Sequence, residues 1–171
     1  VVAPLAREAG LTEIEVAGIL TLSAAIYALM IPQWGRWADR FGRKRVMVFS
    51  LFAMAGSNMI FLFALQAALV GIVTGLSTFF LLVFTRLWFG LLAPGLQPAA
   101  MAAMTDATTS ATRAGGLGML SAAMALGSIL GPAGSSVLAE FGALAPIWGS
   151  IVFCAIAGLF VSFALPKSRG N

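Results

Sequence analysis

Five apolar stretches, each about 20 residues long, constrain this chain more than any other feature of its sequence. They cover residues 14–34, 46–66, 75–96, 115–138 and 146–165. A helix of about 20 mostly apolar residues crosses the ~30 Å hydrocarbon core of a bilayer. Because 60% of the residues are hydrophobic and only 9% are charged, the chain cannot cover a water-soluble globule with polar surface. We therefore expect an all-α membrane protein, a polytopic bundle of about five transmembrane helices.

Prolines and glycines set the expected ends of these helices. We expect Pro32 and Gly35 to end the first span, and Gly42 to permit the tight reversal into the second. Residues 67–74 are expected to form a tight turn together with the ends of the neighbouring helices. The polar run 105–112 is expected to be a loop between the third and fourth spans. The far end of the third span should be loosened by Pro94, Gly95 and Pro98.

The N-terminal residues predict a helix start that is not the beginning of the bundle. Thr12, followed three residues later by Glu15, matches a capping box. Residues 1–5 are expected to be the last turn of a preceding helix, and residues 6–13 an outer loop. With a polar tail at 166–171, the chain is expected to be a fragment of a longer protein.

Charge predicts the orientation in the membrane. With the five spans alternating in direction, eight of the ten basic residues fall on one side, namely Arg36, Arg40, Arg43, Lys44, Arg45, Arg113, Lys167 and Arg169. The other side holds Arg7 together with Glu8, Glu13, Glu15 and Glu140. Basic residues in short loops stay cytoplasmic. We expect an integral protein of the plasma (inner) membrane, with the N-terminus of this chain outside and its C-terminus cytoplasmic.

Composition argues against most enzymatic chemistry. The chain has no histidine and one cysteine, Cys154, so it lacks the commonest general base and cannot form an intramolecular disulfide or a cysteine-based metal cluster. We expect no enzymatic activity, no metal and no cofactor. Although the pI is 10.2, most basic residues lie in short loops between apolar spans, so nucleic acid is not an expected partner.

The loop between the first two spans carries the most specific motif. By charge alone, it is a basic loop obeying the positive-inside rule. Its pattern Gly-x-x-x-Asp-Arg-x-Gly-Arg-Lys, however, resembles motif A of the major facilitator superfamily, and it is formed by Gly35, Asp39, Arg40, Gly42, Arg43 and Lys44. The resemblance implies that residues 1–171 are a partial N-terminal six-helix domain, running from the end of helix 1 to helix 6. Helix 1 would be largely missing, and so would the C-terminal half of the same polypeptide.

The resemblance also implies a gate. In that family the motif's aspartate engages a helix end in the C-terminal half, and an arginine bridges to an acid at the cytoplasmic end of helix 4. The matching acid in this sequence is Asp106. We therefore expect an Asp39–Arg43–Asp106 network that breaks and forms again during transport.

Arg86 stands near the middle of the third span. An arginine there costs about 2.5–3.5 kcal/mol on insertion scales, so it indicates a functional site unless it snorkels to an interface. Together with Leu82 and Gly90 it resembles the family's motif B, although Phe89 replaces the usual glutamine. The resemblance implies that Arg86 and Gly90 belong to an intramembrane coupling or substrate pathway. Since no acid lies deep in the five spans, the coupling carboxylate is expected elsewhere.

The fourth span carries a stripe of small residues. Gly127, Gly131 and Ser135 repeat every four residues, which is typical of helix packing in membranes. With Gly118 and Pro132, the spacing also resembles motif C, the helix 5 signature of family members that export by antiport. This resemblance favours an exporter.

Together these features predict a transmembrane transporter that works by alternating access. We expect proton-coupled efflux, by antiport, of small lipophilic drugs or metabolites. Its expected partners are the lipid bilayer, a small-molecule substrate and protons. Two alternatives remain: a uniporter or symporter of a small metabolite, and a membrane sensor or assembly subunit that does not transport.

Overall fold

The computed structural model describes residues 12–165, and that part of the chain is helical without strands. The elements in order are α2 (Glu13–Phe41), α3 (Arg43–Leu69), α4 (Leu76–Leu92), the 3₁₀ turn η1 (Ala93–Gly95), α5 (Leu96–Ala107), α6 (Arg113–Ala139) and α7 (Ala145–Ala164). Within it, 5 helical runs are long and apolar enough to cross a membrane, with α4, η1 and α5 counted as the single run Leu76–Ala107. This confirms the predicted all-α bundle of transmembrane helices.

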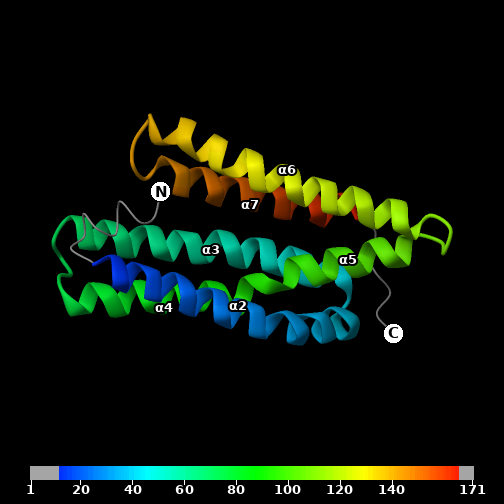
Figure 1. Ribbon diagram of the computed structural model, residues 1–171, viewed down its shortest axis with the longest axis horizontal. Helices are drawn as coiled ribbons and strands as arrows, with labels where there is room; N and C mark the ends of the chain where they lie inside the picture. The colour runs from blue at the N-terminus through cyan, green and yellow to red at the C-terminus, as the bar shows by residue number, and fades with distance from the viewer. Residues whose placement is uncertain (1–11, 166–171) are drawn as a thin grey trace.

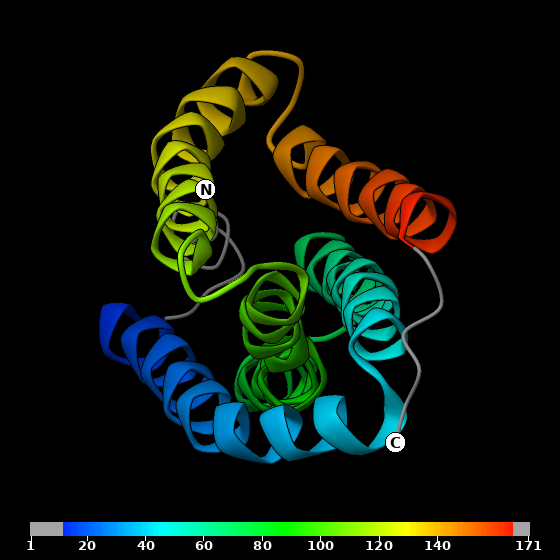
Figure 2. The same ribbon diagram turned by 90° about the vertical axis from the view of Figure 1, so that its right-hand side faces the viewer.

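The helices lie side by side along the long axis of the molecule (Figure 1). Viewed along that axis, α4 and α5 lie between α2 and α3 (Figure 2), and α7 packs along α3. One buried cluster joins α2, α3, α4 and α7 around Phe61, Leu62, Leu65 and Leu82. A second, around Trp34, Ala38, Val46 and Ala99, holds the end where α2 turns into α3.

The predicted capping box starts α2. The backbone N–H of Glu15 donates to Thr12 Oγ1 at 3.3 Å, and the N–H of Thr12 donates to Glu15 Oε2 at 2.8 Å. Two donors that the helix leaves unpaired are therefore satisfied. The predictions for residues 1–11 and for the tail 166–171 lie outside the described residues.

The prediction that Pro32 and Gly35 end the first helix is wrong, because α2 continues to Phe41 with Pro32 inside it. A proline removes one helical hydrogen bond, a loss that neighbouring groups and local adjustment can offset in a membrane helix. The continuation is favoured because Trp34 and Ala38, one turn apart, are both buried in the second cluster. The reversal occurs at Gly42, whose φ of 94° suits glycine, as the sequence predicted.

The loop expected at residues 105–112 is also shorter than predicted. The helix runs through the η1 turn and resumes as α5 up to Ala107. Thr105 Oγ1 donates to the Met101 carbonyl at 2.9 Å, and Thr108 Oγ1 donates to the Met104 carbonyl at 2.8 Å. These bonds let polar threonines remain in or beside a helix. As predicted, residues 67–74 combine a helix end with a tight turn, since α3 continues to Leu69 and α4 begins at Leu76.

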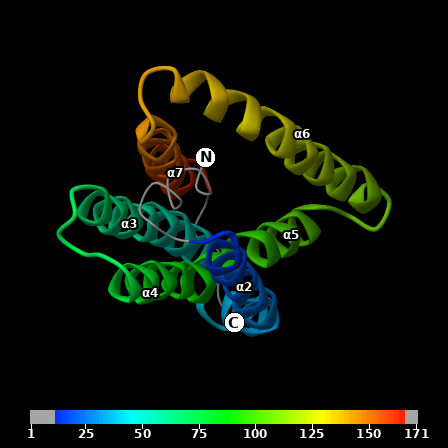
Figure 3. The ribbon, with the colours of Figure 1, turned by 60° about the vertical axis from the view of Figure 1, so that its left-hand side comes forward.

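Helix α6 lies at the outer edge of the bundle. None of its residues is buried, and Figure 3 shows it crossing the outside, joined to α5 at one end and to α7 at the other. It approaches α5 closely at Gly116, where an added Cβ would lie 3.0 Å from Met104 Sδ. Its middle turns have no close neighbour in the described residues, so one face of α6 stands open.

Candidate functional site

Arg43 joins three helices at the basic end of the bundle. Its Nη2 lies 3.2 Å from Asp39 Oδ1 on α2, and its Nε lies 2.5 Å from Asp106 Oδ2 on α5. The two acid side chains are 68% and 59% exposed. Because exposed ion pairs contribute only about 0–1 kcal/mol each, the network can open at small energetic cost. In residues 12–165, no group of three or more His, Cys, Asp or Glu side chains could hold a metal ion.

Local structure explains why these three groups meet. Asp39 lies in the last turn of α2, and Arg43 is the first residue of α3. They are four residues apart in sequence, and the reversal at Gly42 keeps their side chains close enough to pair. Asp106 reaches the same place because α5 remains helical to Ala107. The sequence predicted Asp106 as the partner acid but did not predict α5, the helix that positions it.

The other residues of the basic motif have different surroundings. Lys44 Nζ donates to the carbonyl oxygen of Leu165, the C-cap of α7, a tether that sequence reasoning missed. Arg40 lies over the Phe41 ring, with its Cζ 5.6 Å from the centroid. An added Cβ at Gly35 would lie 3.9 Å from Pro98 Cβ, which is ordinary contact. Steric crowding alone therefore does not require glycine at position 35.

Arg86 lies against an aromatic face. Its Cζ is 3.5 Å from the centroid of the Phe61 ring on α3 and 5.8 Å from the Phe89 ring. Its Nε is buried without a hydrogen-bond partner, and it forms no ion pair with an acid in residues 12–165. A desolvated cation over an aromatic face gains about 2 kcal/mol. Phe61, which is 2% exposed, was not predicted, since only the packing of α3 against α4 reveals the pair.

Gly90 lies one turn from Arg86, at the contact between α4 and α2. An added Cβ would lie 2.9 Å from the Ser23 carbonyl oxygen and 3.3 Å from Ile26 Cγ2. Ser23 Oγ in turn donates to the Arg86 carbonyl at 3.0 Å. Gly90 thus allows close packing of two helices. The structure places the Arg86 guanidinium against Phe61 of α3 and packs Gly90 against α2, and their grouping in one pathway stays a prediction.

Gly95 has a packing role that sequence reasoning missed. An added Cβ would lie 2.8 Å from Trp34 Cε3 and would also clash with Ser50 Oγ. In the sequence, its position next to Pro94 was the only signal. The η1 turn can therefore sit between α2 and α3 only because residue 95 has no side chain.

The small-residue stripe of α6 faces no described helix closely. An added Cβ at Gly118, Gly127 or Gly131 would meet nothing within 4 Å among the described residues. Pro132 lies inside α6, which continues past it to Ala139. The stripe is therefore available for contacts other than those within residues 12–165.

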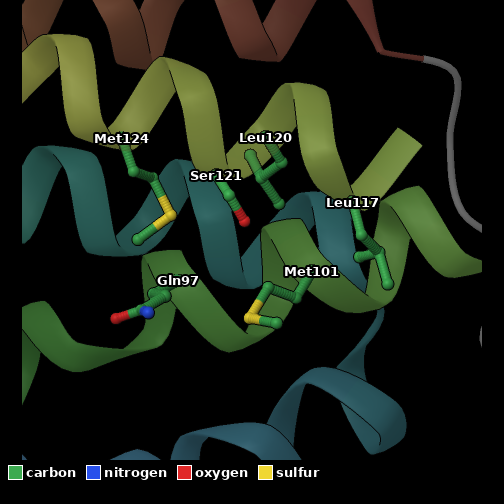
Figure 4. A pocket seen from close by; sticks show the side chains of 6 residues that line it. All are labelled: Gln97, Met101, Leu117, Leu120, Ser121 and Met124. Atoms are coloured by element: carbon green, nitrogen blue, oxygen red, sulfur yellow. The ribbon is translucent and has the colours of Figure 1, made fainter. Parts of the chain in front are cut away.

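A cleft lined by methionines separates α5 from α6. Figure 4 shows Gln97 and Met101 on α5 opposite Leu117, Leu120, Ser121 and Met124 on α6. Its volume is about 200 Å³, below the roughly 300–1,000 Å³ of most small-molecule pockets. Methionine side chains repack easily around different shapes, so this surface suits part of a wall that accepts varied apolar molecules.

Comparison with known proteins gives one family along the whole chain. The sequence model of the Major Facilitator Superfamily matches residues 1–171. Multidrug resistance protein 2 of Bacillus subtilis is 34% identical over 152 residues, 88% of this chain. Multidrug resistance protein 1 of the same organism is 32% identical over 155 residues, 90% of this chain. A triacylglyceride transporter of Mycobacteroides abscessus is 31% identical over 157 residues, 91% of this chain.

These relatives are longer proteins. The matched region covers 35% and 37% of the two Bacillus proteins and 28% of the mycobacterial one. The chain thus spans about a third of the length of its curated relatives. No solved structure matches the chain.

Proposed function

Because the chain belongs to the Major Facilitator Superfamily, we propose that it is part of a proton-coupled exporter of small lipophilic drugs or metabolites. The observation that carries the proposal is Arg86, a cation that lies in a membrane span without a carboxylate partner in the described residues. An ionisable residue at this depth indicates an ion or substrate pathway. The names of the two Bacillus relatives support drugs as cargo.

Arg86 would act by exchanging partners. In the arrangement described here its guanidinium rests on Phe61. A deprotonated carboxylate elsewhere in the full-length protein would attract the guanidinium, and protonation of that carboxylate would release it to the aromatic face. Coupling requires that proton and substrate each favour a different state. The Phe61 ring provides the binding surface that the Arg86 guanidinium needs when it leaves the carboxylate.

The Arg43 network would act as the gate. The described basic side chains other than Arg86 lie at one end of the bundle, and the positive-inside rule makes that end cytoplasmic. The N-terminus of the chain is then outside and its C-terminus cytoplasmic, in the plasma membrane. Asp39 and Asp106 would hold α2, α3 and α5 together in one state, and their exposure would let the pairs break as the helices rock.

The substrate would contact apolar, adaptable surface. The cleft between α5 and α6 supplies two methionines and two leucines, and its small volume implies that further helices complete the site. The open stripe of α6, with Gly118, Gly127, Gly131 and Pro132, would pack against such helices in the rest of the polypeptide. That the Bacillus relatives are longer than this chain is consistent with that arrangement.

The test is dye efflux by the full-length protein in proteoliposomes with an imposed pH gradient. We expect efflux that stops when an uncoupler removes the gradient. Arg86→Ala should abolish gradient-driven efflux, whereas Arg86→Lys should retain part of it because it keeps the charge. Efflux that ignores the gradient would contradict antiport and favour a uniporter. Dye binding without movement would favour the sensor or assembly subunit.

A further inference from the structure

A groove of about 420 Å³ opens between α2 and α3 at the basic end of the bundle. It is lined by Trp34, Trp37, Phe41, Arg45, Val46 and Phe49. It exists because α2 packs mainly on α4, and α3 packs mainly on α7, α4 and α5, so that the two helices pack less on each other. The volume is within the roughly 300–1,000 Å³ range of small-molecule sites.

The floor of the groove is held in place. Trp34 is 5% exposed, and its Nε1 donates to the Leu91 carbonyl on α4 at 2.8 Å. Trp37 meets it edge to face at 4.7 Å between centroids, and Phe49 stacks on it at 5.6 Å. Phe41 and Phe49 are 53% and 50% exposed. An apolar surface of this shape beside a bilayer suits a hydrocarbon chain.

The cation that lines the groove, Arg45, has no partner in the described part of the chain. Arg43 is paired with Asp39 and Asp106. Lys44 donates to Leu165, and Arg36 Nη1 donates to Gln33 Oε1 at 3.3 Å. Arg45 is exposed and lines the groove, and it makes no hydrogen bond or ion pair within residues 12–165. Its guanidinium is therefore available to an anion at the point where the apolar floor ends.

We propose that this groove binds one anionic diacyl phospholipid. One of its two acyl chains would lie against Trp34, Trp37 and Phe49, and its phosphate would bind Arg45. The planar guanidinium fork matches phosphate oxygens. Aromatic side chains with adjacent basic residues are typical of the headgroup depth of a membrane. A lipid satisfies both features of the groove, the apolar floor and the single free cation, without any further protein partner.

The experiment uses the tryptophans as reporters in the full-length protein. Trp88, Trp148 and any tryptophan outside this chain are replaced by Phe, which leaves Trp34 and Trp37. The protein is placed in phosphatidylcholine bilayers that contain the same mole fraction of either brominated phosphatidylglycerol or brominated phosphatidylcholine, whose bromines quench nearby indoles. We expect about a fivefold preference for the anionic lipid, as one basic contact provides.

Variants assign that preference to the groove. Arg45→Gln should reduce quenching by the anionic lipid to the level of the zwitterionic one. Arg36→Gln removes the same charge at the same end of the bundle, but Arg36 does not line the groove, so this variant should keep the preference. Equal quenching by both lipids in the wild type, an equal loss in Arg36→Gln, or no quenching by either lipid would each overturn the proposal. The readout is lipid contact, so it is independent of whether the protein exports drugs.

Discussion

The guanidinium carbon of Arg86 lies 3.5 Å from the centroid of the Phe61 ring, within the apolar core shared by α3 and α4. The negative face of the Phe61 ring attracts the guanidinium and so replaces the carboxylate that would otherwise neutralise it. A charge inside a membrane is thereby accommodated without a countercharge from residues 12–165. Such a cation remains free to exchange partners, which a permanent salt bridge would oppose.

We predict that progressive fluorination of Phe61 reduces gradient-driven efflux in steps. Fluorine withdraws the negative charge of the ring face while leaving its size nearly unchanged, and the contact contributes about 2 kcal/mol when desolvated. Unnatural amino acid incorporation at position 61, followed by efflux in proteoliposomes, measures this. The same series at Phe89, at 5.8 Å from Arg86, should have a clearly smaller effect. A flat response at position 61 would show that the ring serves only for packing.

Gly90→Ala should destabilise the protein. The added methyl would lie 2.9 Å from the Ser23 carbonyl oxygen, and overpacking of this kind costs about 1–3 kcal/mol. We expect a lower Tm for the full-length protein in detergent. Gly18→Ala, on α2, meets nothing within 4 Å and should leave Tm unchanged or slightly higher. Equal Tm values for the two variants would contradict the described packing of α2 on α4.

Asp106→Asn should change the rate of transport more than stability. Its pair with Arg43 is more than half exposed on the acid side, so we expect no more than about 1 kcal/mol of lost stability. Stopped-flow efflux would report an altered rate, and a Tm measurement would show little change. Thr105→Val is the matched control, since Thr105 is close in sequence but its hydroxyl donates to the Met101 carbonyl and not to Arg43. Wild-type rates in Asp106→Asn would argue against the gate.

Gly42→Ala should weaken the α2–α3 reversal. At a φ of 94°, a side chain is strained by roughly 1–3 kcal/mol. Limited proteolysis of the full-length protein should then cut near residue 42 faster than in the wild type. Gly115→Ala, in the first turn of α6 and with open space around it, should leave the digestion pattern unchanged. Unchanged cleavage near residue 42 would mean that the turn tolerates a side chain.

Length and hydropathy were enough to predict the five spans, because a bilayer requires continuous apolar helices. The capping box of Thr12 and Glu15 and the reversal at Gly42 were also readable, since both depend on residues near each other in the chain. The ends of helices depend on tertiary packing as well. Pro32 suggested an end that burial of Trp34 and Ala38 overrode.

For the candidate sites, too, the sequence determined some features and the tertiary structure decided others. The sequence by itself determined that a basic motif joins two membrane spans, that an arginine lies within a third, and that a row of glycines runs along a fourth. Only the tertiary structure decided that Arg86 rests on Phe61, that Lys44 holds the end of α7, and that Gly95 makes room for Trp34 and Ser50. The physical reason is that local signals act within a few residues along one helix. A cation and its aromatic partner, or a glycine and the side chain it admits, are instead brought together by how separate helices pack.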